Sequence, residues 1–468
     1  MKIDVSVKNL GRLKEGTIKI RPITLLTGPN GTGKSFFTKS LYSIFNVINK
    51  NVYHVSISKK IRDINLLLDG YIYSLSYAGE RDEIAISSLK RKLKEIQTEL
   101  NHASELKIQE YLNFAKAQAN IVDGLENYFD NYLLTLQGKL TKKRSIESQS
   151  NTLKKSFSSL KNKLNDSLEN YQDALSENLN DEIKDNFQIT DLSELVTFDN
   201  DKTEIDIDEL IHIEFGKGGV GFSLGHDFIN EISSLSRVVF FESPAYWKVR
   251  EALISAKENL NRPVFLGKTS NKILTGVPKY FYDLNDALKT SVKDNTSEEI
   301  IELTNSIENS LGGKFIFSGD SLVYKDNKTG KEVSKNLISF GMTNLGMIHA
   351  LLNNNIITPG SFVFIDEPET NLHPDWQVLL MEVLIKLAKS EVNIVIATHS
   401  IDMLKALEVG IKKQKDTIDD DFMSIQFLDI DGQLLKFDSD ASLEQLKEAN
   451  HMLTASYEKL YFQGCSID

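Results

Sequence analysis

Cysteine is almost absent from this 468-residue sequence, which contains only Cys465. A single thiol forms neither an intramolecular disulfide nor a cysteine metal site, so both devices are excluded as sources of stability within one chain. The sequence also lacks any apolar run near the roughly 20 residues that a membrane-spanning helix needs. Its first residues, which carry several charges, have no apolar signal-peptide core. These absences predict a cytoplasmic protein that does not enter a membrane.

Positive charge is also in short supply. The 54 Lys and Arg residues face 66 Asp and Glu residues, which gives a formal net charge of −12. Proteins that coat DNA are usually basic, and an acidic chain adheres poorly to phosphate polymers. A local basic groove is still compatible with this balance, so contact with nucleic acid stays an open question.

The middle of the sequence is poor in proline and glycine. No proline occurs between Pro29 and Pro244, and glycine is nearly absent from residues 80–215. Apolar residues recur there every three or four positions, in two runs: Ile86, Leu89, Leu93, Ile96, Leu100 and Ala103, then Leu153, Phe157, Leu160, Leu164, Leu168, Tyr171 and Leu175. This spacing is typical of a coiled coil or a packed helical hairpin. We predict a helical insertion at residues 80–185, with two arms, solvated outer faces and a polar bend between the arms.

Strands and helices alternate on both sides of this insertion, which predicts an α/β fold with a mostly parallel sheet. Before the insertion we expect an antiparallel β-hairpin within residues 3–20, a strand at 23–26 and a helix at 35–45. After it we expect strands at 238–241, 361–365 and 392–397, and helices at 342–352 and 376–387. β-alternation within residues 312–333 includes a turn at 326–330. The predicted domains are therefore residues 1–79, 80–185 and 186–468.

A glycine-rich motif follows the expected strand at 23–26. Residues 28–35 read Gly-Pro-Asn-Gly-Thr-Gly-Lys-Ser, which fits the phosphate-binding pattern G-x-x-x-x-G-K-S/T at every fixed position. The curled backbone and the N-terminal end of the next helix both favour an anion. Lys34 is placed to reach the β- and γ-phosphates of ATP, and Ser35 to ligate Mg²⁺. The other predicted nucleotide contacts are Asn30, Gly31, Thr32 and Gly33. A chance match in an ordinary turn is the alternative, and the strand–loop–helix context disfavours it.

Two acids close the apolar strand expected at 361–365. The carboxyl end of such a strand lies at the edge where an open α/β sheet binds ligands. Asp366 can hold Mg²⁺ through water, and Glu367 can orient or deprotonate the attacking water. An ordinary strand with two solvated acids is the alternative, and the phosphate-binding motif in the same chain disfavours it.

Two histidines and a serine–glycine pair complete the candidate set. His399 ends the strand expected at 392–397 and can hydrogen-bond the γ-phosphate, unless it is an ordinary surface histidine. His373 is interpreted mainly as shaping the turn after the two acids. Ser339 and Gly341 open a helix and can bind a phosphate through its dipole. A plain helix N-cap is the alternative for Ser339.

These motifs, in this order, resemble those of ABC-type ATPases of the SMC and OLD-like groups. The resemblance covers residues 8–35 and 337–407, and depends most on Phe-Val-Phe-Ile-Asp-Glu-Pro-Glu-Thr-Asn-Leu-His-Pro at 362–374 and Val-Ile-Ala-Thr-His-Ser at 395–400. It implies a P-loop ABC-type ATPase head with a helical coiled-coil insertion, which binds ATP and Mg²⁺ and dimerises around two ATP molecules. One subunit would contribute Lys34, Ser35, Asp366, Glu367 and His399, with residues 369–372 as its D-loop. The other subunit would contribute Ser339 and Gly341.

The sequence departs from the family pattern in two places. Residues 339–344 read Ser-Phe-Gly-Met-Thr-Asn instead of the transporter-like Leu-Ser-Gly-Gly-Gln, which weakens the expected contact across the dimer. No glutamine can be assigned to the Q-loop, since Gln97 and Gln109 both fall within helical patterns.

The segment after His399 bears on the chemistry expected of the chain. OLD-like nucleases carry a Toprim nuclease domain after the ATPase, whereas only 69 residues follow His399 here. Asp429 and Asp431 superficially match a Toprim D-x-D, but the Asp-Gly dipeptide at 431–432 predicts a hairpin turn. We therefore expect a standalone ATPase without a nuclease domain. It resembles the AriA subunits of PARIS and the PtuA subunits of Septu, phage-defence pairs in which a separate protein does the damage.

The leading prediction is an ATP-hydrolysing sensor or scaffold of bacterial anti-phage defence. It would form a homodimer or higher homo-oligomer, respond to a trigger such as a phage-encoded protein, and control a separate nuclease or toxin. The alternative is a DNA repair or recombination ATPase that acts directly on nucleic acid. A metabolic P-loop kinase is disfavoured, because His399 and the motif at 362–374 have no purpose in a kinase.

Overall fold

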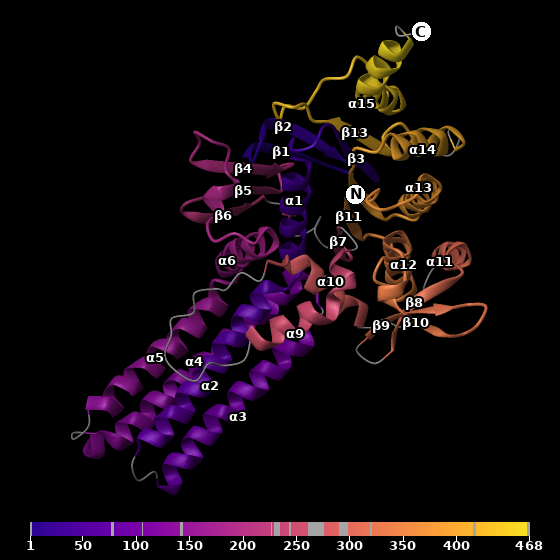
Figure 1. Cartoon of the computed structure of the whole chain (residues 1–468). Coiled ribbons are helices and arrows are strands. Elements are labelled where there is room, and N and C mark those ends of the chain that lie inside the picture. The colour runs from indigo at the N-terminus through magenta and orange to yellow at the C-terminus, as the bar shows by residue number, and fades with distance from the viewer. Residues whose placement is uncertain are drawn as a thin grey trace. The chain divides into compact units, whose positions relative to one another are not determined.

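The computed structural model describes residues 2–75, 79–104, 106–140, 144–225, 227–228, 235–242, 245–260, 276–289, 298–318, 321–414 and 418–465 (Figure 1). The chain divides into two compact units. Unit 1 comprises Met1–Asn49, Leu179–Gly225 and Ser234–Asp468, and unit 2 comprises Lys50–Asn178 and His226–Ser233. These limits differ from the predicted domains at 1–79, 80–185 and 186–468, because the helix at residues 52–74 packs with the helices that follow it. No change in composition marks that boundary in the sequence.

A parallel sheet forms the centre of unit 1. Its strands are β3 (Ile23–Thr27), β7 (Val238–Phe241), β11 (Phe362–Asp366), β12 (Asn393–Ala397) and β13 (Met423–Phe427), in the order β13-β3-β12-β11-β7. Every neighbouring pair is parallel. β3, β11 and β12 are buried along their whole length, as continuous apolar strands of a covered parallel sheet should be. The order brings the carboxyl ends of β3, β12 and β11, which are far apart in sequence, to one edge.

The helices that lie wholly in unit 1 contact this sheet or one another, and three of them correspond to the helices predicted at 35–45, 342–352 and 376–387. They are α1 (Lys34–Ile48), α8 (Ala245–Lys248), α9 (Arg250–Leu260), α10 (Lys279–Lys289), α11 (Glu298–Leu311), α12 (Phe340–Asn353), α13 (Pro374–Lys389), α14 (Ile401–Lys412) and α15 (Ser442–Cys465). Aromatic rings join α1 to the sheet: Phe45 lies 4.9 Å from Phe362 and Tyr42 lies 5.3 Å from Phe240, between ring centroids. The helix that follows the glycine-rich loop is therefore fixed by buried contacts to β11 and β7.

An antiparallel sheet in the order β2-β1-β4-β5-β6 also belongs to unit 1. Its strands are β1 (Ile3–Leu10), β2 (Leu13–Ile20), β4 (Lys202–Ile207), β5 (Ile211–Gly216) and β6 (Gly219–Leu224). The expected N-terminal hairpin is confirmed, since Ile3 pairs with Ile20 and Leu10 with Leu13. β4–β6 were not predicted, although Thr203, Ile205 and Ile207 alternate with charged residues in the pattern of a half-buried strand.

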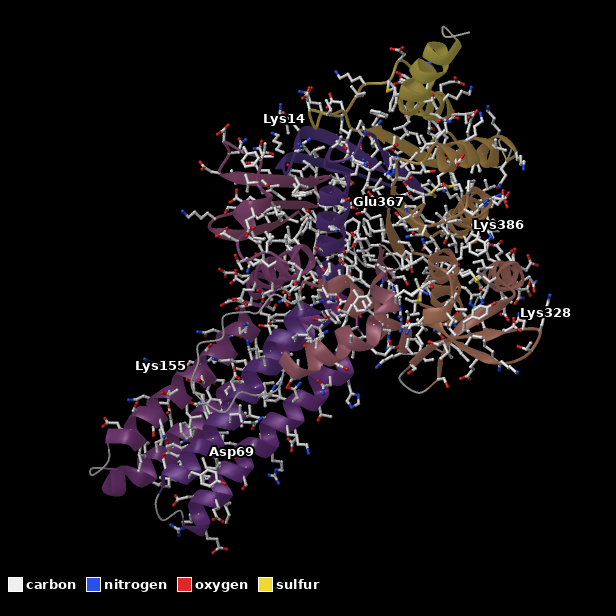
Figure 2. The ribbon with its side chains drawn as sticks, viewed as in Figure 1. Lys14, Asp69, Lys155, Lys328, Glu367 and Lys386 are labelled. Carbon is white, nitrogen blue, oxygen red and sulfur yellow. The ribbon has the colours of Figure 1, made fainter. Side chains whose placement is uncertain are left out.

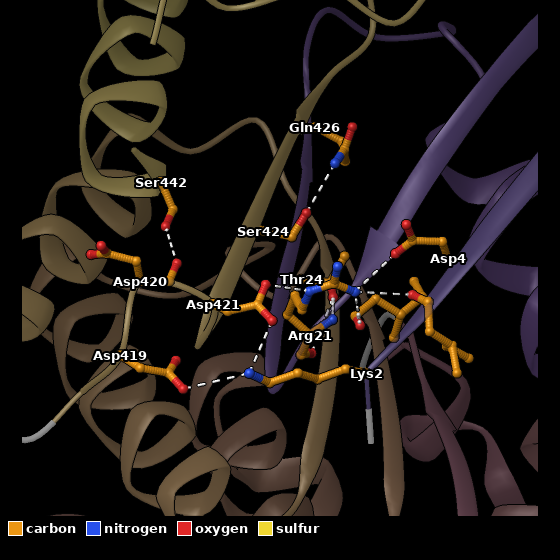
Figure 3. A network of polar contacts seen from close by, with 12 residues as sticks. Lys2, Asp4, Arg21, Thr24, Asp419, Asp420, Asp421, Ser424, Gln426 and Ser442 are labelled. Atoms are coloured by element: carbon orange, nitrogen blue, oxygen red, sulfur yellow. Dashed lines mark hydrogen bonds and ion pairs between the residues drawn. The ribbon is translucent and has the colours of Figure 1, made fainter. Parts of the chain in front are cut away.

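A polar network at Arg21 connects the end of the hairpin to the start of β13 (Figure 3). The guanidinium donates to Asp421 Oδ1 at 2.6 Å and to Asp4 Oδ1 at 3.0 Å, and the Nζ atom of Lys2 lies 2.9 Å from Asp421 Oδ2. Asp421 keeps a depressed pKa, mainly through its hydrogen bond with Lys2. The network therefore joins residues near the two ends of the sequence.

A smaller antiparallel sheet, in the order β10-β9-β8, consists of β8 (Gly313–Ser318), β9 (Ser321–Asp326) and β10 (Glu332–Ser334). The predicted turn at 326–330 joins β9 to β10, where Thr329 N and Gly330 N both bond Asp326. Helices α11 and α12 pack against this sheet. Short 3-10 helices occur at Leu192–Leu195 (η1) and Lys335–Leu337 (η2).

Unit 2 consists of packed helices: α2 (Val52–Ser74), α3 (Glu80–Ala103), α4 (Ile108–Leu140), α5 (Arg144–Asn165) and the start of α6 (Ser167–Phe187), which continues into unit 1. Helices α3 to α6 span most of the insertion predicted at residues 80–185, but they do not form two arms. α2 contacts α3 and α5, and α4 contacts α3 and α5, so apolar seams are shared among these helices instead of between two arms. The second predicted arm breaks at Asp166, between α5 and α6.

Among the described residues, none of the helices combines the length and apolar character that crossing a bilayer requires.

Candidate functional site

The glycine-rich loop between β3 and α1 forms one wall of the site. Gly28, Gly31 and Gly33 adopt positive φ angles of 132°, 76° and 109°, which side chains other than glycine rarely allow. A Cβ at Gly28 would also lie 2.1 Å from the carbonyl oxygen of Leu428. The loop thus depends on glycine both for its curl and for its close approach to the chain after β13.

Lys34 lies against this loop. Its ammonium donates to Gly28 O at 2.8 Å and to Pro29 O at 2.7 Å, and the residue is only 6% exposed. Burial lowers the pKa of the ammonium, while the carboxylates of Asp366, Glu367 and Glu369 oppose that shift. The structure therefore holds a cation at the loop and positions it with backbone carbonyl groups.

Ser35 and Asp366 meet at the edge of the parallel sheet. Ser35 Oγ, in the first turn of α1, donates to Asp366 Oδ1 at the end of β11 over 3.1 Å. Asp366 is 3% exposed, and this burial raises the pKa of its carboxyl to about 6. The hydrogen bond from Ser35 and the charge of Lys39 oppose the increase, whereas Glu242 and Glu367 add to it.

Glu367, which is labelled in Figure 2, directly follows β11 and has an unusual backbone conformation. Its φ angle of 50° is in the left-handed region, which is uncommon for a residue with a long side chain. Its N–H donates to Ala397 O, at the end of β12, over 2.8 Å. Such outliers persist only where the surroundings enforce them and are concentrated at functional sites. The bond to β12 therefore fixes where this carboxylate leaves the sheet.

His399 is paired with an acid of the same chain. Its Nδ1 atom lies 3.2 Å from Glu369 Oε1, and the same oxygen accepts a bond from the His399 backbone N–H at 3.0 Å. The imidazole remains 40% exposed, whereas Glu369 is 9% exposed. Glu369 therefore joins the segment after β11 to the segment after β12, and it leaves part of the ring accessible.

The predicted residues on α12 and α13 have local structural contacts. Ser339 accepts a bond from Met342 N at 3.2 Å as the N-cap of α12, which is the alternative considered for it above. Gly341 is buried, and a Cβ there would lie 2.9 Å from Asn371 O. His373 caps α13 by accepting from Asp375 N, in agreement with a role in shaping that turn. The beginning of α12 thus packs against the residues that follow the two acids.

The predicted hairpin at 429–432 is present. Asp429 N donates to Gln433 O at 3.0 Å, Gly432 N donates to Asp429 O at 3.1 Å, and Leu428 bridges Leu434. Asp429 Oδ1 accepts from the backbone of Asp431 and Gln433. The carboxylate of Asp429 is therefore engaged in forming the turn.

A cavity of about 1050 Å³ opens beside the glycine-rich loop. The predicted residues Asn30, Gly31, Thr32, Gly33, Lys34, Ser35 and Glu367 all line it. Arg12, in the turn of the first hairpin, and Lys14, at the start of β2, add exposed cations to the wall. Asp366, His399, Ser339 and Gly341 are not among the described residues that line it. The structure thus gathers most of the predicted set in one cavity, joins Asp366 to it through the bond from Ser35, and leaves His399, Ser339 and Gly341 out of the described lining.

Sequence reasoning missed Glu242 and Lys39. Glu242 follows β7, the strand beside β11, and its Oε1 atom lies 2.9 Å from Lys39 Nζ on α1. It also accepts a hydrogen bond from the Tyr280 hydroxyl. An acid after the short apolar run at 238–241 was the available signal, but nothing local reveals that β7 neighbours β11.

The described residues contain no group of three or more His, Cys, Asp or Glu that could hold a metal ion. Mg²⁺ is usually bound through one or two protein oxygens together with waters and substrate phosphates. One buried carboxylate beside one hydroxyl, next to a phosphate-binding loop, fits that requirement. Asp366 and Ser35 would therefore hold Mg²⁺ only when a nucleotide supplies further oxygens.

The sequence matches one protein-family model, described as "AAA domain, putative AbiEii toxin, Type IV TA system", over residues 23–404. No curated protein matches the sequence.

Several solved structures are similar at low sequence identity. The SMC head domain from Thermotoga maritima is 9% identical with a TM-score of 0.36, and the match covers 94% of this chain and 100% of that one. An Smc head domain with a coiled coil and joint from Pyrococcus yayanosii is 12% identical with a TM-score of 0.32. That match covers 96% of this chain and 100% of the other. MJ1267, an ATP-binding cassette of an ABC transporter in its ADP conformation, is 11% identical with a TM-score of 0.31. That match covers 96% of this chain and 98% of the other. Within this chain, the parallel sheet and the phosphate-loop motif between β3 and α1 show a P-loop α/β fold.

Proposed function

The chain belongs to this AAA-domain family, and on that premise we propose that it binds ATP with Mg²⁺ and hydrolyses the ATP between two copies of itself. The family match itself supports an AAA-type ATPase domain. The proposal adds the residues that carry out the reaction, the dimer in which they work, and the biological role of the cycle.

The contact between Ser35 and Asp366 is the observation that carries the proposal. It joins the phosphate loop to the acid-ended strand over 3.1 Å across 331 residues of sequence. In P-loop NTPases this pair of residue types holds Mg²⁺, while the loop lysine binds the β- and γ-phosphates. Lys34 would exchange its bonds to Gly28 O and Pro29 O for bonds to phosphate oxygens.

Glu367 would act as the general base toward the attacking water. It lines the cavity together with the phosphate loop, directly follows Asp366 at the end of β11, and has its backbone fixed by the bond to Ala397. His399 would contact the γ-phosphate through the part of its ring that Glu369 leaves accessible. Ser339 and Gly341 would reach the nucleotide of the partner copy, which agrees with their position outside the cavity of their own chain.

Glu367→Gln tests this assignment. The amide preserves the shape of the side chain but cannot accept a proton, so ATP should still bind while phosphate release falls by about two orders of magnitude or more. Light scattering should then find the variant trapped as a dimer with ATP and Mg²⁺. Glu332→Gln, at an exposed position on β10, is the matched control and should behave like the wild type. Turnover of Glu367→Gln within a few-fold of the wild type would place the catalytic carboxylate elsewhere.

We further propose that the ATP cycle makes the chain a sensor or scaffold of anti-phage defence that controls a separate effector. The family description names a toxin–antitoxin system, which supports a defence role in general. A partner that distinguishes the ATP-bound dimer from the free chain would be held or released as the population shifts between them. The trigger would be a phage-encoded component.

Co-purification with the protein encoded next to it tests this role. The complex should form or dissociate when ATP and Mg²⁺ are added, and the Glu367→Gln dimer should fix it in one state. The chain alone should not cut DNA or RNA. Robust cleavage by the isolated chain that disappears in Asp429→Ala/Asp431→Ala would overturn the view that it acts only through a partner.

One observation favours the alternative, an ATPase that acts directly on nucleic acid. A groove of about 620 Å³ between α2 and α3 is lined by Arg62, Lys90, Arg91 and Lys94, with Asp69 as its acid. Residues 50–178 contain 19 Lys and Arg against 17 Asp and Glu, so the acidity of the chain lies outside them. Duplex binding whose affinity falls steeply with salt, and which Arg62→Glu/Lys94→Glu abolishes, would favour this alternative.

A further inference from the structure

Two exposed apolar side chains line the cavity beside the phosphate loop. Phe198, in the loop between η1 and β4, is 94% exposed, and Ile430, in the hairpin after β13, is 69% exposed. Single exposed apolar residues on a protein surface need no explanation. These two belong to segments 232 positions apart in sequence, yet both face the cavity that contains Lys34 and Ser35.

The loop that carries Phe198 is held by the backbone around it. Thr197 N donates to Asn9 O at 3.0 Å, and Thr197 Oγ1 donates to Gly11 O at 2.7 Å. On the other side of the phenylalanine, Asn200 N donates to Thr197 O at 3.2 Å, and Asn200 Nδ2 donates to Phe198 O at 3.3 Å. The ring is therefore exposed on an ordered turn, so presenting it to a ligand does not require the turn to form first.

The hairpin that carries Ile430 is fixed in a similar way. Leu428 N donates to Thr27 O at 2.9 Å, at the end of β3, and Lys14 N donates to Gly432 O at 3.3 Å. Gly432 has a φ angle of 75°, and a Cβ there would lie 2.0 Å from Arg12 O. The hairpin therefore packs on both the phosphate-loop strand and the turn of the first hairpin, and Ile430 points its apolar surface at the same cavity.

We propose that Phe198 and Ile430 form the nucleobase subsite, with the base stacked on the Phe198 ring and covered by Ile430. A ring face attracts any base, because every base has a π-face. The subsite rests on the proposed nucleotide function and adds the part of the ligand that it recognises. Recognition by faces instead of edges means that purine triphosphates bind alike and more tightly than pyrimidine triphosphates.

The test compares ATP with inorganic tripolyphosphate, each with Mg²⁺, by isothermal titration calorimetry. Phe198→Ala should weaken ATP by about 5- to 150-fold, the range expected for one lost stacking contact, and leave tripolyphosphate affinity unchanged. Phe198→Trp should restore ATP affinity, and Ile430→Ser should weaken ATP selectively but less. Tyr73→Ala, which removes an aromatic ring that is 87% exposed on α2, is the matched control and should change neither affinity.

The outcomes separate the two proposals. Equal loss of both ligands in Phe198→Ala, or no loss of ATP affinity, would overturn the base subsite while leaving the phosphate site intact. Lys34→Ala should weaken both ligands together. A wild-type chain that binds neither ligand would rule out both the proposed nucleotide function and the base subsite.

Discussion

At the residue scale, function and stability conflict at Asp366. Burial raises the pKa of this carboxyl to about 6, whereas the pKa of an Asp in an unfolded chain is ~3.9. Between these two pH values the folded protein retains a proton that the unfolded chain has lost. The free energy of unfolding therefore falls as pH rises from ~3.9 to ~6, and above pH ~6 the protein has lost all of the stability that the retained proton provides.

Asp366→Asn should consequently stabilise the protein in metal-free buffer at pH 7.5. We expect a gain of about 1–3 kcal/mol in the free energy of unfolding, because the amide removes the need to keep a buried carboxylate ionised. The gain should shrink toward zero by pH ~4, and urea titrations across the pH range measure it. Asp440→Asn, at an exposed position, should show no such trend. An advantage that does not vary with pH would contradict the raised pKa.

Lys34→Ala should abolish the increase in melting temperature that ATP and Mg²⁺ give the wild type. Without the ammonium, the β- and γ-phosphate oxygens lose their cationic partner in the loop, and a ligand that no longer binds no longer stabilises the folded state. Thermal scans with and without nucleotide measure the effect. Lys386→Ala, at an exposed position near the end of α13, should retain the full increase. An unchanged response in Lys34→Ala would remove this lysine from the site.

At the scale of elements, local signals predicted what local interactions determine. The apolar run that forms β11 and the glycine-rich loop before α1 were both predicted, because a buried strand and a tight turn each depend on the types of a few consecutive residues. The break at Asp166 was not, since neither glycine nor proline marks it. α2 was also missed, although Ile57, Ile61, Ile64 and Leu68 have helical spacing, because it lies before the predicted start of the insertion.

The site residues that were not predicted from the sequence depend on which distant segments lie next to each other in the fold. Glu242 gains significance only because β7 pairs with β11, as shown by Phe241 facing Ile365. Phe198 and Ile430 line the cavity only because the η1–β4 loop and the final hairpin reach the same place. No residue pattern within one segment reveals such a neighbour.

Gly346→Ala tests the packing between α12 and the small sheet. A Cβ at this position would lie 2.1 Å from the ring of Phe315, which is itself only 2% exposed and has little room to move. We expect a loss of about 1–3 kcal/mol, typical of overpacking. Gly124→Ala makes the same change inside α4, where nothing lies within 4 Å, and should be neutral or stabilising. Equal unfolding midpoints for the two variants would show that α12 can move away from β8.

At the scale of the whole molecule, unit 1 contains every described residue of the candidate site. The two points at which its chain leaves and returns are close together. Asn46 Nδ2 donates to Glu182 Oε1 at 2.6 Å, and Asn186 Nδ2 donates to Ser43 Oγ at 2.9 Å. The end of α1 and the last two turns of α6 therefore lie side by side.

Replacing residues 50–178 with a short Gly/Ser linker should leave ATP affinity within a few-fold of the wild type. A flexible linker can close the short gap between α1 and α6 without strain, and the nucleotide contacts are all retained. Calorimetry with ATP and Mg²⁺ measures the outcome, and circular dichroism checks folding. A folded variant that no longer binds ATP would show that the helices of unit 2 take part in forming the site. If those helices respond to an effector, the variant should also lose the nucleotide-dependent change in partner affinity.

The order of the parallel sheet also determines when this protein can begin to work during its synthesis. β3 (Ile23–Thr27) is synthesised long before its partners, β12 and β13, which lie at residues 393–397 and 423–427. The helices of unit 2 make local contacts with one another, so they can form before the strands that pair with β3 have been synthesised. The final hairpin, which closes the cavity, emerges later still. The cavity is therefore incomplete until the hairpin at residues 428–434 has been translated, so shorter products lack part of the proposed nucleotide site.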